Sequence, residues 1–287
     1  MLKTIVLRQF DSQSPCVILL GGFDGLHLGH RRLVQRAKTF GLPIGIMTIK
    51  DCKRAGDLFT VTEREEIFKS EGIDFVLEMD FSKIKDLSPQ EFINLLKKDR
   101  VVKAFVCGTD FKFGAGAKGD HSTIRELGEE VFVEELLFEN GEKVGVSLIK
   151  EELAKGNAKQ AKKLLGHAFF VEGEVEEDRK IGRTIGFPTA NIRYPMGKFP
   201  IKIGVYETSA VIDGKRYKGI TNYGARPTFL DREVWTETHF ISYTGDLYGK
   251  KIKIEFERWL REIEKFGDAK MLKNQLEKDV RRVTEND

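Results

Sequence analysis

The sequence predicts an α/β protein with two different halves: a first half with a parallel sheet covered by helices, and a second half forming an antiparallel β-barrel with a terminal helix. In the first half, short apolar runs such as residues 17–20 and 44–49 alternate with amphipathic segments, which is the pattern of a parallel sheet with helices on its faces. In the second half, strand-like segments flank Asp213-Gly214, a strong signal for a two-residue hairpin turn. A small antiparallel barrel followed by a helix fits this order.

Two capping boxes mark helix starts in the first half. Thr62 with Glu65 predicts one start, and Ser88 with Glu91 predicts another, strengthened by Pro89 at the first helical position. A helix is also predicted over residues 28–40, ending at Gly41. Strands are predicted at residues 17–20, 44–49, 75–77, 104–107 and 131–134.

The second half begins after a charged, alanine-rich stretch. Residues 151–166 are predicted to be a helix that links two domains, one over residues 1–150 and one over residues 167–287. The predicted strands alternate polar and apolar side chains, and the predicted terminal helix covers residues 268–280. These strands lie at residues 205–212, 216–223, 236–242 and 251–256.

Composition limits the functional classes. A net charge of +3 over 287 residues is too mild to indicate a nucleic-acid partner. The apolar runs are far shorter than the roughly 20 residues of a membrane span, and the N-terminus lacks a secretory signal pattern. The cysteines Cys16, Cys52 and Cys107 are widely separated, which argues against a disulfide framework or a zinc site. A cytoplasmic protein with no membrane partner is expected.

The second half contains unusual polar segments: GRTIGFPTAN at residues 182–191, NYGARPT at 222–228, TETH at 236–239 and GDLYG at 245–249. Thr189 and Asn191 are two residues apart, so their side chains point the same way on an extended segment. Hydroxyl and amide oxygens are hard ligands, which suit Mg²⁺ carried by ATP.

These segments, in this order, resemble the riboflavin kinase family over about 115 residues. The resemblance implies transfer of the γ-phosphate of ATP to riboflavin, giving FMN. It also implies that Thr189 and Asn191 hold Mg²⁺ and that Glu237 is the general base that removes the proton of the ribityl 5′-hydroxyl. His239 is predicted to lie on the strand face opposite Glu237 and to be structural.

Further residues of these segments are expected to handle phosphate and substrate. Glycines at 182 and 186 let the backbone pass close to phosphates, and Arg183 adds charge. Arg226 belongs to a predicted substrate loop. The ATP and phosphate set is therefore Gly182, Arg183 and Gly186.

The segment GFDGLHLGH at residues 22–30 follows a predicted strand and opens a helix. A helix N-terminus presents free N–H groups to phosphate, and His27 and His30 could stabilise charge at an α-phosphate. The segment resembles the HxGH nucleotidyltransferases, specifically the FMN adenylyltransferase half of bacterial bifunctional FAD synthetases, which implies a Rossmann-like fold, FMN and ATP as ligands, and FAD as product. The resemblance gives the site residues Gly22, Asp24, His27, His30, Asp110, Ser147 and Lys150.

Two elements of that family are altered here. An FDPHP-like stretch is replaced by IKDCK at residues 49–53, and ISSTxIR is replaced by VGVSLIK at residues 144–150. Gly145 and Val146 supply no side-chain donor, and Lys150 loses the bidentate phosphate grip of arginine. We therefore expect a reduced adenylyltransferase beside an intact kinase.

Two alternatives stay open. The chain could be a fully bifunctional FAD synthetase that tolerates these substitutions, or a flavin-binding regulatory protein. The intact TETH and PTAN segments argue against pure sensing, because a sensor need not keep a catalytic base. The GxGxxG match at residues 114–119 follows no first strand-to-helix turn and is interpreted as a flexible loop.

Overall fold

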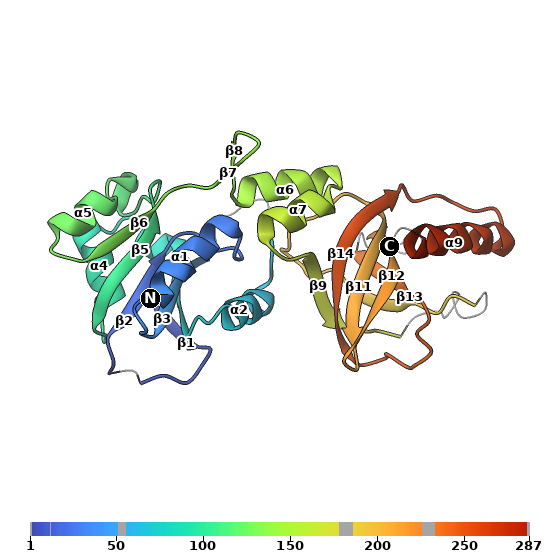
Figure 1. The fold of residues 1–287 in the computed structure, drawn as a ribbon, viewed down its shortest axis with the longest axis horizontal. Coiled ribbons are helices and arrows are strands. Elements are labelled where there is room, and N and C mark those ends of the chain that lie inside the picture. The colour runs from blue at the N-terminus through green and yellow to red at the C-terminus, as the bar shows by residue number, and fades with distance from the viewer. Residues whose placement is uncertain (1, 12, 51–55, 178–185, 226–232, 286–287) are drawn as a thin grey trace. The chain divides into compact units, whose positions relative to one another are not determined.

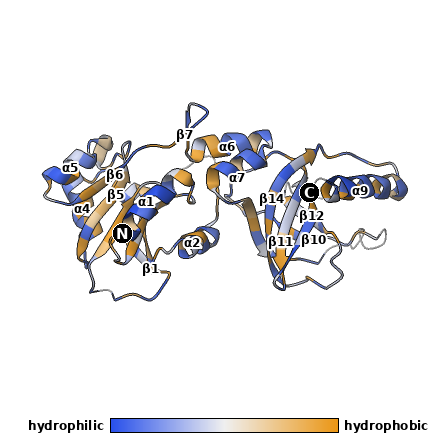
Figure 2. Cartoon of the chain, viewed as in Figure 1, coloured by the Kyte–Doolittle hydropathy of each residue, from blue (hydrophilic) through white to orange (hydrophobic). Residues whose placement is uncertain are grey.

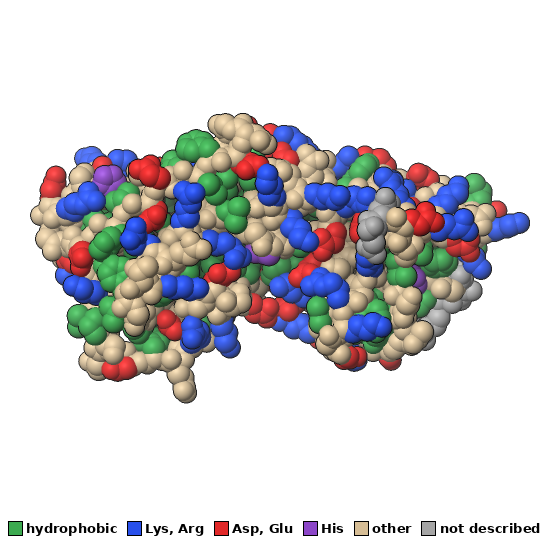
Figure 3. All heavy atoms as spheres, viewed as in Figure 1, with side chains coloured by type: hydrophobic (Ala, Val, Ile, Leu, Met, Phe, Trp, Pro, Cys, Tyr) green, Lys and Arg blue, Asp and Glu red, His purple; other side chains and the backbone are tan. Residues whose placement is uncertain are grey.

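The computed structural model describes residues 2–11, 13–50, 56–177, 186–225 and 233–285 (Figure 1). The chain divides into two compact units, Met1–Leu148 and Ile149–Asp287. Basic and acidic side chains are interspersed on the face shown in Figure 3. Among the described residues, no helix is both long and apolar enough to cross a membrane.

The first unit contains a six-stranded sheet in the order β1-β4-β3-β2-β5-β6. Strands β2 to β6 are parallel, and β1 pairs antiparallel with β4 at one edge. The strands are β1 (Lys3–Val6), β2 (Cys16–Leu20), β3 (Ile44–Lys50), β4 (Phe75–Asp80), β5 (Val102–Gly108) and β6 (Val131–Glu134). All five predicted strands are confirmed, and the α/β prediction with them; β1 was not predicted because its residues are mostly exposed.

The helices of this unit are amphipathic, whereas its central strands are hydrophobic (Figure 2). Strand β2 is completely buried, as expected for a central strand with helices on both faces. The helices are α1 (Leu28–Lys38), α2 (Val61–Ser70), α3 (Phe81–Ile84), α4 (Pro89–Lys97) and α5 (His121–Glu126).

One predicted helix start is wrong by two residues. The capping box of α2 is formed by Thr60 and Glu63, not by Thr62 and Glu65: Thr60 Oγ1 accepts from Glu63 N at 3.3 Å, and Glu63 Oε2 accepts from Thr60 N at 2.8 Å. Both pairs match the capping pattern, and the earlier start lets the helix bury Glu63 as well. The box of Ser88 at α4 is confirmed.

The second unit is a nearly closed antiparallel barrel in the order β10-β13-β12-β11-β14-β9. A bridge between Glu176 and Asn191 links its two edges. Asp213 (φ 50°) and Gly214 (φ 79°) form the predicted hairpin turn, which needs two left-handed residues. The strands are β9 (Phe169–Glu174), β10 (Ala190–Arg193), β11 (Gly204–Ile212), β12 (Lys215–Ala225), β13 (Val234–Phe240) and β14 (Lys251–Arg261).

The terminal helix α9 (Ala269–Thr284) is confirmed and runs four residues beyond the prediction, with Asp268 as its N-cap. Arg261 and Asp279 hold it to the barrel through an ion pair of 2.7 Å. The predicted helical stretch at residues 151–166 is two helices, α6 (Val146–Lys155) and α7 (Ala158–Leu165), separated at Gly156, which has a φ of 85°.

Candidate active site

The residue expected to be the catalytic base, Glu237, lies between two asparagines. It is directly opposite Asn191 of β10 on one side and Asn222 of β12 on the other. Directly opposed residues of antiparallel strands present their side chains on the same face, about 5 Å apart. Asn222 Nδ2 donates to Glu237 Oε2 at 3.4 Å. These three residues form what we call the Asn–Glu–Asn row.

Two amide oxygens of this row lack partners. Within the described part of the chain, the buried Oδ1 atoms of Asn191 and Asn222 accept no hydrogen bond, and Asn191 is only 4% exposed. A buried acceptor without a partner costs free energy, so such atoms call for a donor or a cation. An amide oxygen is a hard ligand, and Asn191 therefore fits a magnesium ion that ATP carries.

Thr189 immediately precedes β10, is partly buried and lines a cavity of about 290 Å³. The opposite wall comes from the turn after β13, at residues 243–248. The GDLYG segment and the first three residues of the PTAN segment therefore line one cavity, although nearly sixty residues separate them in the sequence.

His239 lies on the same face as Glu237, and the prediction of opposite faces was wrong. Residues two apart in a strand share a face because side chains alternate. His239 Nδ1 lies 2.9 Å from the carbonyl oxygen of Pro188, and its ring packs edge-on against Phe187. Burial lowers the pKa of His239. Its role is to anchor the segment that leads into Thr189.

Of the remaining predicted kinase residues, only Gly186 lies in the part of the chain that the structure describes. Gly186 is exposed with a φ of 86°, a left-handed conformation suited to glycine. Gly182, Arg183 and Arg226 lie outside the described residues. Asn222 lies in the NYGARPT segment but is not among the predicted site residues. Its place opposite Glu237 follows from strand register, which the sequence alone did not reveal.

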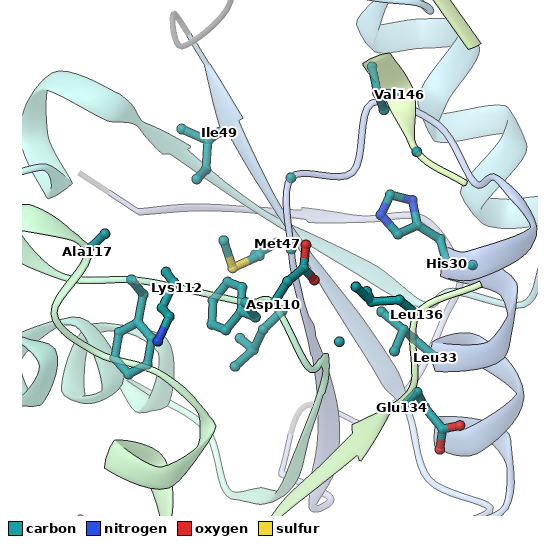
Figure 4. A pocket seen from close by; sticks show the side chains of 18 of the residues that line it. His30, Leu33, Met47, Ile49, Asp110, Lys112, Ala117, Glu134, Leu136 and Val146 are labelled. Carbon is teal, nitrogen blue, oxygen red and sulfur yellow. The ribbon is translucent and has the colours of Figure 1, made fainter. Parts of the chain in front are cut away.

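The first unit has a cavity of about 700 Å³. It lies beyond the carboxyl ends of β2 and β5, where the strand order reverses, which is the usual ligand crevice of such sheets. The ring of His30 and the carboxylate of Asp110 both lie within it (Figure 4). The predicted residues Gly22, His27, His30 and Asp110 line it, together with Lys85, Lys112, Glu134, Lys143 and Gly145.

The two histidines are held at the start of α1. His27 is the N-cap, and its Nδ1 accepts from the backbone N–H of His30 at 3.3 Å. Neutral His27 therefore carries its proton on Nε2. His30 Nδ1 lies 3.1 Å from the carbonyl oxygen of Gly25, and the two rings stack with centroids 3.6 Å apart. Burial, then the charges of His30 and Lys143, lower the pKa of His27 to about 2, against an opposing effect of Asp110.

Three other predicted residues lie away from this cavity's lining. Asp24 is fully buried and accepts the N–H of Leu58 with both carboxylate oxygens at 3.0 Å, so it braces a loop. Ser147 is exposed in the first turn of α6. Lys150 belongs to the second unit, with its ammonium 5.3 Å from the centre of the Phe199 ring.

The sequence also missed a cation of this cavity. Lys143, from the hairpin formed by β7 (Phe138–Glu139) and β8 (Glu142–Lys143), forms an ion pair with Asp110. The GxGxxG stretch lines the cavity too, through Gly114 and Gly116. It was predicted as a flexible loop, but it contains a short 3-10 helix at Ala115–Ala117 and is closed by paired backbone hydrogen bonds between Phe113 and Gly119 at 2.9 and 3.0 Å.

The low pKa of His27 predicts an acid-sensitive first unit. The pKa of His27 is about 2 in the folded chain and 6.5 in the unfolded chain. At pH values between these two, the unfolded chain binds a proton at His27 and the folded chain does not. Stability is therefore complete above pH 6.5 and is lost as the pH falls below it, by about 2 kcal/mol at about pH 5. His27→Gln should lose less stability over this range, as measured by urea unfolding at about pH 7.5 and about pH 5.

Far-UV circular dichroism follows both units in that experiment. The two tryptophans, Trp235 and Trp259, both lie in the second unit, so their fluorescence serves as the internal control. Equal acid sensitivity of the parent and His27→Gln in the circular-dichroism transition would contradict the assigned pKa.

Comparisons with known proteins cover both units. A riboflavin kinase family model matches residues 165–286, and an FAD synthetase model matches residues 9–145. The chain is 33% identical over 290 residues to the bifunctional riboflavin kinase/FMN adenylyltransferase of Escherichia coli K12, covering 93% of this chain and 92% of that protein. This chain belongs to that family. The Bacillus subtilis member is 32% identical, covering 94% and 92% of the two chains.

A solved structure also matches nearly the whole chain. It is a Streptococcus pneumoniae protein described as a macrolide-efflux protein, with a TM-score of 0.86 and 28% identity, covering 98% of this chain and 97% of that one. The first unit is thus the nucleotidyltransferase-like domain of the family, and the barrel is its riboflavin kinase domain. The chain is a kinase by family, and both activities of the family use ATP as co-substrate.

Proposed function

We propose that this chain phosphorylates riboflavin with MgATP to give FMN and ADP. The Asn–Glu–Asn row carries the proposal, because it places a carboxylate beside a buried amide oxygen that has no partner among the described residues. Phosphoryl transfer needs a positioned base and charge neutralisation more than covalent chemistry. The riboflavin kinase family match supports the substrate. The direct test is incubation with riboflavin, ATP and magnesium, followed by separation of the flavins.

Glu237 acts as the general base. Its carboxylate takes the proton of the ribityl 5′-hydroxyl, and the hydroxyl oxygen bonds to the γ-phosphorus while the bond to the β–γ bridging oxygen breaks. Asn191 and Thr189 hold the ATP-bound magnesium ion, which neutralises phosphate charge. We assign phosphate contacts to Gly182, Arg183 and Gly186, and a substrate-loop role to Arg226.

We propose that the first unit keeps the adenylyltransferase fold but adenylylates FMN slowly. His27 and His30 face the cavity where an α-phosphate would bind. Gly145 and Val146 line the same cavity without side-chain donors, and Asp110 is already engaged by Lys143. The bifunctional relatives favour the alternative that FAD also forms at a useful rate.

The domain limits that we propose are residues 1–150 and 167–287, with residues 151–166 as the link. The expected ligands are riboflavin, FMN and ATP, with FAD as the product of the slower step. Nucleic acid and membrane have no part in this function. Such a biosynthetic enzyme would act in the cytoplasm, where its ATP is available.

Replacing Asn191 by alanine is expected to raise the magnesium and ATP concentrations needed for half-maximal rate. The amide oxygen would be lost, and with it one ligand of the metal. Riboflavin binding without nucleotide should change little. A magnesium titration of the kinase rate, beside flavin fluorescence titration, measures both effects. An unchanged magnesium titration would remove the metal role of Asn191.

A further inference from the structure

The base of the proposed kinase reaction has a polar neighbour to which we have so far assigned no function. We propose that Asn222 is a positioning residue, whose side-chain amide holds the Glu237 carboxylate in the orientation that accepts the substrate proton. The inference rests on the proposed function. Its basis is the juxtaposition of the two side chains on neighbouring strands.

Strand register fixes this juxtaposition. Asn222 of β12 and Glu237 of β13 are directly opposed in a ladder that runs without a shift from Gly219↔Phe240 to Ala225↔Val234. A base carried on paired central strands cannot slide relative to its neighbour without breaking that ladder. The positions of the two side chains are therefore set by the backbone, and the amide needs only its rotamer to reach the carboxylate.

The amide must present its N–H group to the carboxylate. An ionised carboxylate only accepts hydrogen bonds, so the reverse orientation of Asn222 would place two acceptors against each other. The Nδ2–Oε2 distance of 3.4 Å is long, as catalytic hydrogen bonds often are before substrate binds and tightens them. One carboxylate oxygen is thereby tied to the sheet.

Asparagine at position 222 lowers the stability of the strand, which is expected only if its side chain has a function. It lies within β12 between Thr221 and Tyr223, which are 0% and 1% exposed. Asparagine is depleted in strands, where β-branched and aromatic side chains pack better. Its Oδ1 is buried without a partner among the described residues, a further cost. A residue that is unfavourable both for the strand and for its own buried oxygen is typical of a functional site.

The chain offers a matched control. Asn157 Nδ2 donates to Glu152 Oε2 at 2.9 Å, which is the same pair of groups in the same unit, at a shorter distance. Neither residue belongs to the barrel strands. Asn157→Ala therefore removes an amide-to-carboxylate hydrogen bond without touching the Asn–Glu–Asn row.

The test is a double-mutant cycle on the full chain with riboflavin, ATP and magnesium. Asn222→Ala is expected to lower kcat about tenfold to a hundredfold, while the KM values for riboflavin and ATP change by less than about threefold, because only the base is misplaced. Asn157→Ala should leave kcat unchanged. In a Glu237→Gln background, Asn222→Ala should cost little more, because the group that it orients is gone.

The outcomes separate this inference from the proposed function. Asn222→Gln, which keeps the donor on a longer side chain, should recover part of kcat. Additive losses in the cycle would overturn the positioning role, as would full activity of Asn222→Ala. Should Glu237→Gln itself remain active, the assignment of Glu237 as the base fails and the positioning role fails with it, whereas a parent protein that forms no FMN would contradict the proposed function. If Asn222→Ala unfolds, as judged by tryptophan fluorescence, Asn222→Leu replaces it: the donor is lost at nearly the same size and without an added charge, and the same fall in kcat is expected.

Discussion

Glu237→Gln is expected to remove most riboflavin phosphorylation, lowering kcat by about a hundredfold to ten-thousandfold. Glutamine keeps the size of the side chain but cannot take the proton of the 5′-hydroxyl. The barrel should be unaffected, because Glu237 is only partly buried and its strand pairing uses backbone groups. Steady-state kinetics with riboflavin, ATP and magnesium measure the loss.

Glu207→Gln is the matched control for this prediction. Glu207 lies on β11 in the same sheet and accepts from Arg258 Nε at 2.9 Å, away from the Asn–Glu–Asn row. Its kinase rate should equal that of the parent. Both variants should show parental flavin binding, and Glu237→Gln should unfold like the parent. A Glu237→Gln rate within a few-fold of the parent would show that another group removes the proton.

FMN is expected to accumulate while little FAD forms. Loss of one donor to developing charge costs about a hundredfold to a thousandfold in rate, and this first unit lacks more than one. Gly145 and Val146 line its cavity without side-chain donors, and Lys150 lies over Phe199 in the second unit. The cavity itself, at about 700 Å³, is large enough for a ligand. We therefore expect slow chemistry rather than a missing site.

The measurement is a time course with purified protein, excess ATP and magnesium, following FMN and FAD together. A second incubation starts from FMN, so that slow adenylylation is not confused with slow supply of its substrate. Adenylylation at a rate comparable to phosphorylation would contradict the prediction. In that case Lys85, Lys112 and Lys143, the lysines that line the cavity, would be the first residues to test as replacements for the missing phosphate ligands.

Local sequence signals predicted most of the fold correctly. Buried apolar runs gave the parallel strands, and Asp213-Gly214 gave the hairpin. The predicted end of β14 was five residues short, because the register of its pairing with β11 shifts between Val205 and Tyr206 and again between Glu207 and Thr208. A bulge of this kind interrupts the alternation on which the prediction depended. The α2 start was ambiguous because two capping patterns overlap.

The candidate site was predictable only where a motif carried it. Asn191 and Glu237 were chosen from their segments, and strand pairing then placed them opposite each other. Asn222 and Lys143 were not chosen, because their relevance comes from a partner 15 and 33 residues away in the chain. The error on His239 has a different origin, because strand periodicity was misapplied to Glu237 and His239, which are two residues apart and therefore share a face.

Transfer of labelled phosphate tests the central claim most directly. The full chain is incubated with riboflavin, magnesium and ATP labelled at the γ-phosphate, and the flavins are separated and counted. We expect label to appear in FMN in proportion to the riboflavin consumed, and Glu237→Gln to slow its appearance by about a hundredfold or more. Riboflavin that stays unlabelled in the presence of the parent protein would contradict the account.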